Sequence, residues 1–354
     1  MKRIKVAPAV LREAYNIFDG VYAPVSGFLK RSDLESVLFN MRLSEGGIWP
    51  IPIVLNISER EYRDLGDAEQ ISLTDERGKT RVVLDDVEVY EYDREIYVRQ
   101  VFGTDSNDHP GVAAARQGGK YFLGGEVKWA DPNRKNPARY FTPSQTRDLF
   151  RKKGWRTVVA FQTRNIPHRS HEFLQKQALK IADAVFIQPV IGKKKKGDFK
   201  DELILKGYES LLEKYYPQGR YYLASLPLQM RYAGPKEAVM HALIRRNFGC
   251  SHMIIGRDHA GVNGFYGPLE AQNIFDEFSS EELGIEILKF GEVKHCSACG
   301  GLNFASTCPH NGEDHISLSG TGIREMISRG QKLPEELVRP EISELLLNHP
   351  DPFV

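Results

Sequence analysis

The sequence lacks three features that would each indicate a particular class of protein. No apolar run reaches the roughly 18 residues that a membrane-spanning helix needs. The stretch after the basic start Met1-Lys2-Arg3 is too short and too mixed to be the hydrophobic region of a signal peptide. Only four cysteines occur among 354 residues, which argues against a disulfide scaffold. We therefore expect a cytoplasmic protein with no membrane partner.

An excess of charge of one sign is also missing. The 48 Lys and Arg residues nearly balance the 47 Asp and Glu residues, so the formal net charge is +1. General nucleic-acid-binding proteins usually have a strong basic excess, so we expect no nucleic-acid partner. A small anion is not excluded, because one local cluster of Arg and His is enough to bind it. The four lysines at 193–196 indicate a solvated loop or, alternatively, a mobile lid that attracts anions.

Residues 1–140 contain short β-type runs separated by turns, and they predict a small β-rich domain. Examples of these runs are Ile51–Leu55, Arg81–Leu84 and Val87–Tyr90, while residues 31–41 have helical spacing. The polar, turn-rich stretch 131–137 is a plausible linker.

The pattern changes near residue 142, where Thr142-Pro143-Ser144 is typical of a helix start. The continuous apolar run 157–161 fits a strand buried on both faces of a parallel sheet. Helices and strands then alternate, with helices at 168–181 and 236–248 and strands at 184–187 and 253–255. This alternation predicts an α/β, doubly wound domain over 141–316, followed by a small α-rich C-terminal domain at 317–354.

Hydrogen-bond donors crowd the point where the first of these strands ends. They are Gln162, Arg164, Asn165, His168 and His171. Ligands of open α/β sheets bind beyond the carboxyl ends of the strands, and the start of the next helix favours a phosphate group. The alternative is a turn whose polar groups satisfy only the backbone, with a histidine that caps the helix. The spacing matches no metalloprotease motif, which disfavours a zinc site here.

A second polar turn, residues 256–261, follows the strand at 253–255. Gly256 permits close approach of a ligand, Ala260 and Gly261 keep the turn small, and Arg257, Asp258 and His259 add polar groups. The two turns are expected to face each other across a crevice. The alternative is a structural Asp–Arg pair in a tight turn. Arg231, which lies between the turns in sequence, is assigned with equal weight to the same pocket or to a carboxylate partner.

Three of the four cysteines cluster late in the chain, as Cys296-Ser297-Ala298-Cys299 followed by Cys308. With His310 and His315 nearby, this pattern is typical of a structural Zn²⁺ site, and a reactive dithiol is the competing interpretation. We favour His315 as the fourth ligand because it precedes an apolar run and has room to fold back. The remaining cysteine, Cys250, is expected to be an inert core residue.

Taken together, these motifs resemble those of the ATP sulfurylase family, also called sulfate adenylyltransferases. The resemblance covers Gln162-Thr163-Arg164-Asn165 with His168-x-x-His171, the stretch 230–238, and Gly256–Gly261. It extends to Ser26-Gly27-Phe28 and 41–52 near the start and to residues 319–324 near the end. One departure is Ile166, which stands between Asn165 and Pro167 where many family members have Pro directly after Asn. Some prokaryotic members carry a similar Cys/His cluster.

The resemblance implies a PUA-like first domain and a Rossmann-like nucleotidyltransferase domain. It implies sulfate and ATP with Mg²⁺ as substrates, transfer of the adenylyl group with release of pyrophosphate in a reversible reaction, a role in sulfate assimilation, and a homodimer or higher homo-oligomer. By resemblance, Gln162, Arg164 and the Ala260 backbone hold sulfate. The catalytic, phosphate-holding residues are Thr163, Arg164, Asn165, His168 and His171, and Gly256, Arg257, Asp258 and His259 lie along the nucleotide. The sequence contains no Gly-x4-Gly-Lys-[Ser/Thr] motif of a fused kinase.

Two other functions compete with this one. The His-x-x-His turn alone also fits a nucleotidyltransferase that adenylylates a carboxylate or phosphate. A PUA-like first domain also occurs in RNA-binding modules, although the balanced charge argues against that function.

Overall fold

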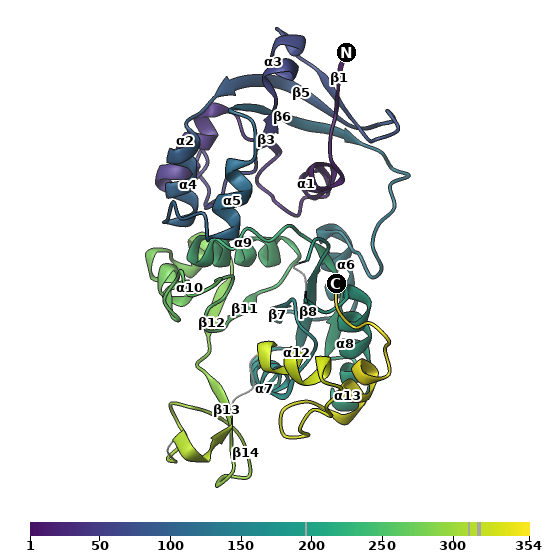
Figure 1. The fold of residues 1–354 in the computed structure, drawn as a ribbon, viewed down its shortest axis with the longest axis vertical. Coiled ribbons are helices and arrows are strands. Elements are labelled where there is room, and N and C mark those ends of the chain that lie inside the picture. Colours follow the sequence, from purple (N-terminus) through teal and green to yellow (C-terminus); the bar gives the residue numbers. More distant parts are fainter. Residues whose placement is uncertain (195–196, 311, 317–319) are drawn as a thin grey trace.

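The computed structural model describes residues 1–194, 197–310, 312–316 and 320–354, which form three regions along the long axis of the molecule (Figure 1). A mixed sheet with its helices lies at the N-terminal end, a parallel sheet lies in the middle, and a small three-stranded sheet projects from the opposite end. None of the helices in the described ranges combines the length and the apolarity needed to cross a lipid bilayer.

The N-terminal sheet has the strand order β1-β4-β5-β6-β2, with β3 also paired to β6. Only the β1–β4 pair is parallel. Helices cover one side of this sheet, and Leu73, Leu84 and Leu123 are fully buried in its core. The elements of this region are β1 (Lys2–Lys5), α1 (Pro8–Phe18), β2 (Gly27–Phe28), α2 (Arg31–Asn40), β3 (Leu55–Ile57), α3 (Glu59–Leu65), β4 (Ile71–Thr74), β5 (Thr80–Glu91), α4 (Arg94–Phe102), α5 (Pro110–Arg116) and β6 (Tyr121–Ala130).

One expectation for this region was wrong in detail. The run Ile51–Leu55 is not a strand, since β3 begins only at Leu55. Its proline, Pro52, has no N–H to donate to a ladder, and pairing starts after it. The region also contains the helix α5, which was not predicted from the sequence. His109 caps this helix, because its Nδ1 accepts hydrogen bonds from the backbone N–H of Gly111 at 3.1 Å and of Val112 at 3.3 Å.

The central sheet is entirely parallel and has the order β10-β8-β7-β11-β12, with β9 also paired to β8. The chain runs from β7 outward through β8, then returns to the other side of β7 at β11. The crevice between β7 and β11 is therefore the switch point of the sheet, where ligands of such folds bind. The strands are β7 (Val158–Thr163), β8 (Ala184–Ile191), β9 (Tyr221–Leu223), β10 (Leu226–Pro227), β11 (His252–Ile255) and β12 (Glu286–Lys289).

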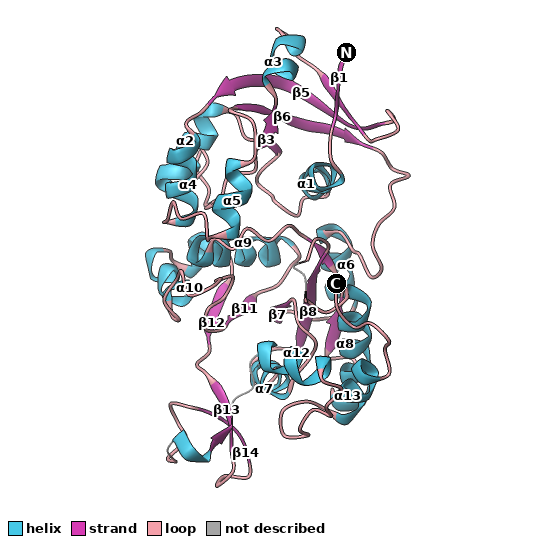
Figure 2. Ribbon diagram, viewed as in Figure 1, coloured by secondary structure: helices cyan, strands magenta, loops and turns pink. Residues whose placement is uncertain are grey.

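Helices pack on both faces of this sheet, as the doubly wound prediction requires (Figure 2). The first of them begins as predicted at Pro143, where Thr142 and Gln145 form a capping box. The helical elements are α6 (Pro143–Lys152), α7 (Arg169–Ala178), α8 (Asp201–Tyr215), α9 (Gly234–Asn247), α10 (Glu270–Asn273), η1 (Ile274–Glu277), α11 (Ser280–Leu283), α12 (Gly320–Ser328) and α13 (Pro340–Leu347).

The alternation of side chains along β7 decides which helices its polar end meets. Val159 and Phe161 belong to the core that includes residues of α7, α8, α12 and α13. Val158 and Ala160 belong to the core that includes α9 and the N-terminal region. Because successive side chains of a strand point to opposite faces, Gln162 continues toward α9 and Thr163 toward α8.

Candidate active site

The first polar turn begins where β7 ends and is held by Thr163. The Thr163 hydroxyl accepts from the Asn165 N–H at 3.1 Å and donates to the Asn165 carbonyl at 3.2 Å. Thr163 is buried, so its side chain stabilises the turn rather than facing solvent. The additional residue Ile166 is fully buried in the core beside the turn, which explains how the chain accommodates it.

His168 occupies the N-cap position of α7, but its side chain makes no capping hydrogen bond. Instead, its ring stacks on that of His171, with 3.6 Å between the centroids. His171 Nδ1 lies 3.2 Å from the Tyr208 hydroxyl of α8. Burial lowers the pKa of His168 to about 4, and burial together with His168 lowers the pKa of His171 well below its usual value. Both rings are therefore neutral at pH 7, and the helix-capping alternative does not describe His168.

The α7 N-terminus is only partly available to a ligand. The Arg169 N–H donates to the Leu337 carbonyl at 2.8 Å, so the C-terminal region occupies one of its donors. Nearby, Asn165 lies beside the start of α12, where a side chain in place of Gly320 would meet its amide at 3.5 Å. The C-terminal segment that resembled the family thus packs against the first turn.

Arg164 carries the positive charge of the first turn. Its guanidinium donates to the Tyr232 hydroxyl at 2.9 Å and lies 5.0 Å from the centroid of that ring. Within the described ranges it forms no ion pair with a carboxylate. A half-buried cation without a carboxylate partner is suited to bind an anion.

The second turn follows β11 in a backbone conformation that few residues adopt. Asp258 and Ala260 both have positive φ, at 51° and 58°. Such left-handed conformations cost free energy for residues other than glycine and often occur at functional sites. A Cβ on Gly261 would lie 1.9 Å from Asp258 Oδ1, so a larger residue there would require the Asp258 carboxylate to move. A Cβ on Gly256 would meet no protein atom within 4 Å, which leaves room beside the backbone for a ligand.

The structural Asp–Arg pair considered for this turn does not form. Arg257 instead pairs with Glu292 at 2.8 Å, in the segment that leads to the small sheet. Asp258 is largely exposed, but the surrounding protein removes some water from its carboxyl group, and this desolvation raises its pKa.

A hydrogen-bonded chain joins the two turns across the crevice. His241 Nδ1 lies 2.9 Å from Gln162 Nε2 and 3.1 Å from His259 Nε2. His241 comes from α9, the helix that packs on the Gln162 side of the sheet. The predicted meeting of the two turns is thus achieved through a histidine that sequence reasoning did not single out. Its partners are 79 and 18 residues away in sequence, so no local pattern marks it.

The two remaining basic features near the site have protein partners. Arg231 pairs with Glu13 of α1 at 2.9 Å, which decides between its two proposed roles in favour of a carboxylate partner. Lys194 is tied to Asp201 at 2.8 Å and to the Phe199 carbonyl at 2.7 Å, and burial lowers its pKa. Lys195 and Lys196 lie outside the described residues, so the lid remains a prediction.

A cavity of about 440 Å³ lies between α1, α4, α5 and residues 229–232. It adjoins Tyr232 and Lys193, but within the described ranges its lining contains no residue of 162–171 or 256–261. This cavity therefore does not coincide with the two polar turns at the strand ends.

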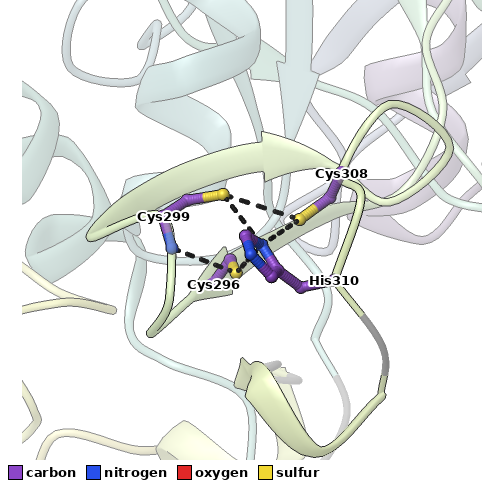
Figure 3. A group of neighbouring side chains, drawn as sticks. All are labelled: Cys296, Cys299, Cys308 and His310. Atoms are coloured by element: carbon purple, nitrogen blue, oxygen red, sulfur yellow. Dashed lines mark hydrogen bonds between the residues drawn. The ribbon is translucent and has the colours of Figure 1, made fainter.

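Three cysteines and one histidine converge in the small sheet of β13 (Val293–Cys296), β14 (Gly301–Phe304) and β15 (His315–Ile316), near the short helix η2 (Gly312–Asp314) (Figure 3). The ligand atoms of Cys296, Cys299, Cys308 and His310 all lie within 4.8 Å of one another. His315, the ligand favoured from the sequence, is not a member of this group, although it lies opposite Cys296 in β15. His310, only two residues after Cys308, turns its Nδ1 to within 3.3 Å of Cys299 Sγ and 3.4 Å of Cys296 Sγ.

The fold and the paired turns at its switch point define a nucleotide-binding α/β protein. A sequence profile of the ATP-sulfurylase family matches residues 137–349, and a profile of PUA-like domains matches residues 1–132. The chain belongs to the ATP-sulfurylase family.

Named relatives and a solved structure agree with this membership. The chain is 48% identical to a sulfate adenylyltransferase of Pyrococcus abyssi over 341 residues, covering 96% of this chain and 88% of that protein. It is 47% identical to one from Thermococcus onnurineus over 340 residues, with coverage of 96% and 88%. The solved structure of a hexameric APS kinase from Thiobacillus denitrificans aligns with a TM-score of 0.74 at 22% identity. That alignment covers 99% of this chain and 64% of the other, and it shows the same fold.

Proposed function

We propose that this protein is a sulfate adenylyltransferase, which joins sulfate to the adenylyl group of ATP and releases pyrophosphate. The observation that carries the proposal is the Gln162–His241–His259 chain, which joins both motif turns. Beside it lies Arg164, which has no carboxylate partner within the described ranges. The relatives that bear this name match nearly the whole chain. The reaction is reversible, so ATP formation from adenylylsulfate and pyrophosphate belongs to the same proposal.

The chemistry asks for positioning and charge stabilisation rather than for a general base. Sulfate is fully ionised at neutral pH, so no proton has to be removed from the nucleophile. The site must place a sulfate oxygen in line with the α-phosphorus and stabilise the charge that develops on pyrophosphate. The neutral imidazole and amide side chains at the strand ends can donate hydrogen bonds for this task, and they bring no negative charge that would repel the anionic substrates.

We assign the residues as follows. Gln162, Arg164 and the Ala260 N–H hold sulfate, and residues 256–259 lie along the nucleotide, where the space beside Gly256 supports close approach. Asn165, His168 and His171 hold the phosphates, and Thr163 contributes by shaping the turn. Arg257 reaches the nucleotide only if its pair with Glu292 opens. Mg²⁺ accompanies ATP, as in other phosphoryl and nucleotidyl transfers.

The Cys₃His cluster is proposed to hold a structural Zn²⁺. Ligands about 2.3 Å from zinc in a tetrahedron are roughly 3.8 Å apart. The separations in the cluster, such as 3.8 Å between Cys299 Sγ and Cys308 Sγ, are close to this spacing. The three thiols and one imidazole are a donor set that zinc prefers.

Three further expectations belong to this proposal. We propose a homo-oligomer, and the similar solved structure from Thiobacillus denitrificans is itself a hexamer. We keep the domain limits 1–140, 141–316 and 317–354, and a cytoplasmic location. Light scattering, limited proteolysis and cell fractionation would test these three points in turn.

Pyrophosphate release from MgATP, measured with and without sulfate, tests the function directly. Sulfate-dependent release, together with ATP formation from adenylylsulfate and pyrophosphate, is the expected result. Release stimulated by molybdate or selenate would further support a tetrahedral oxyanion as the acceptor. Release that depends on a carboxylate or phosphate acceptor, and not on sulfate, would instead favour another nucleotidyltransferase.

A further inference from the structure

Three polar residues line one buried face of helix α9. Glu237, His241 and Arg245 are spaced four residues apart and therefore share a face, and each is 0% exposed. Fully buried charged groups are uncommon in a protein core because desolvation is costly. A row of three directly behind the proposed sulfate site calls for a physical account.

The charged and polar groups around His241 indicate its protonation state, although its Nε2 has no hydrogen-bond partner in the described ranges. His241 Nε2 lies 3.5 Å from Glu237 Oε1, a carboxylate that also accepts from the Arg231 N–H at 2.9 Å and the Ala233 N–H at 3.0 Å. Burial alone would raise the pKa of Glu237, but His241 and hydrogen bonds from the backbone lower it. An ionised carboxylate fixes the proton of His241 on Nε2. Its Nδ1 then offers one lone pair, which the Gln162 N–H at 2.9 Å and the His259 N–H at 3.1 Å share.

This arrangement determines what the two site residues can offer a ligand. Since His241 Nδ1 is an acceptor, the Gln162 amide must turn its nitrogen toward α9, and His259 must carry its proton on Nε2. Gln162 Oε1 has no hydrogen-bond partner within the described ranges, so the amide orientation rests on this one contact. Burial is the main cause that lowers the pKa of His241, and the charge of Arg245 adds to it.

We propose that Glu237 and His241 act as a positioning pair that holds Gln162, and with it the sulfate-binding side of the crevice, in a single hydrogen-bonding state. The proposal rests on the proposed function, because it takes sulfate to be the ligand of Gln162. Neither residue of the pair touches sulfate. Loss of a purely structural residue would raise the KM values for sulfate and for MgATP alike, whereas loss of a positioning residue that acts through Gln162 would raise the KM for sulfate selectively.

The test compares three replacements of His241 by their KM values for sulfate and for MgATP. Asn places an acceptor near the position of Nδ1, Gln places it near Nε2, and Leu offers none. We expect His241→Leu and His241→Gln to raise the sulfate KM about tenfold or more, the effect of losing a hydrogen bond that orients a charged ligand. We expect His241→Asn to stay near wild type. In His241→Leu and His241→Gln the KM for MgATP should rise less than the KM for sulfate, because the contact of His241 with His259 is lost together with the contact with Gln162.

Two further measurements keep the outcome decisive. His241→Leu combined with Gln162→Ala should be no worse for sulfate than Gln162→Ala alone, because His241 acts through Gln162. His252→Asn is the matched control, since His252 also pairs with a carboxylate, Glu286 at 3.2 Å, but at the opposite end of β11. It should leave both KM values unchanged.

The results separate the two proposals. If the wild type is active, three results would overturn the positioning role alone. They are additive effects of the two substitutions in the double mutant, equal rises in the KM values for sulfate and MgATP, and the same sulfate KM in His241→Asn and His241→Gln. If His241→Leu fails to fold, the comparison of Asn with Gln decides the question. Wild type without any sulfate dependence would overturn the proposed function and this inference together.

Discussion

The imidazole rings of His168 and His171 stack at a centroid distance of 3.6 Å, with 32° between their planes, at the start of α7. Two protonated imidazoles would repel each other at this distance, and burial already disfavours their charged forms. The free protein therefore offers neutral rings to its ligand.

The lowered pKa of His168 predicts how stability responds to acid. Its pKa is about 4 in the folded protein and near 6.5 when unfolded, so between these values the unfolded chain binds more protons. The contribution of neutral His168 to the free energy of unfolding is complete above about pH 6.5 and is lost as the pH falls toward 4. Between pH 7 and pH 5 the free energy of unfolding should therefore fall by about 1–2 kcal/mol less in His168→Gln than in the wild type.

Urea unfolding of both proteins at pH 7 and pH 5 measures this difference. The same comparison at pH 8, where the histidine is neutral in both states, isolates any effect of packing. An identical pH dependence in wild type and variant would show that His168 titrates normally.

Replacing Arg164 should separate activity from stability. Its guanidinium bonds to Tyr232 and to no carboxylate within the described ranges, so Arg164→Ala should leave the melting temperature nearly unchanged. Loss of the charge that stabilises the transition state should lower turnover by about a hundredfold or more. Tyr232→Phe, which keeps the ring and removes one hydrogen bond, should lower turnover far less than Arg164→Ala does. Near-normal sulfate-dependent turnover in Arg164→Ala would remove Arg164 from the site.

The sequence predicted the central sheet well because its signals are local. The apolar runs at 157–161, 184–187 and 253–255 became β7, β8 and β11, and the polar residues directly after two of them lie at the switch point. His241 was not predicted, because a histidine inside a helical pattern looks the same whether it is a core residue or part of a site. The choice between His310 and His315 also depends on how the small sheet folds, which spacing alone does not determine.

Ala260 predicts a trade between stability and activity. Its φ of 58° lies in the left-handed region, where glycine is preferred. Ala260→Gly should therefore raise the free energy of unfolding by about 1 kcal/mol. If the Ala260 N–H holds sulfate, a more flexible turn should raise the KM for sulfate and leave that for MgATP unchanged. Thermal unfolding and steady-state kinetics on the same samples measure both effects, and an unchanged or lower stability would contradict the strain.

Removing the metal should act on the site through α7. Phe304 of β14 packs against Phe173 of α7 with 5.2 Å between ring centroids, and Phe173 follows His171 by two residues. We expect chelation of zinc to loosen residues 293–316 first, seen as faster proteolysis there, because the small sheet has few buried side chains of its own. Turnover should fall with it, while the two larger sheets stay folded.

Zinc content of single variants decides which histidine completes the cluster. His310→Ala should lose the metal, because His310 Nδ1 is the donor that lies among the three thiols, whereas His315→Ala should keep it. Cys250→Ala is the matched control for cysteine loss, since Cys250 lies in the core away from this cluster and should leave one zinc per chain. If His315→Ala loses zinc and His310→Ala retains it, the ligand set read from the structure is wrong. If both variants and Cys308→Ser retain zinc, the cluster is not the zinc site, and the dithiol interpretation of the three cysteines becomes the better one.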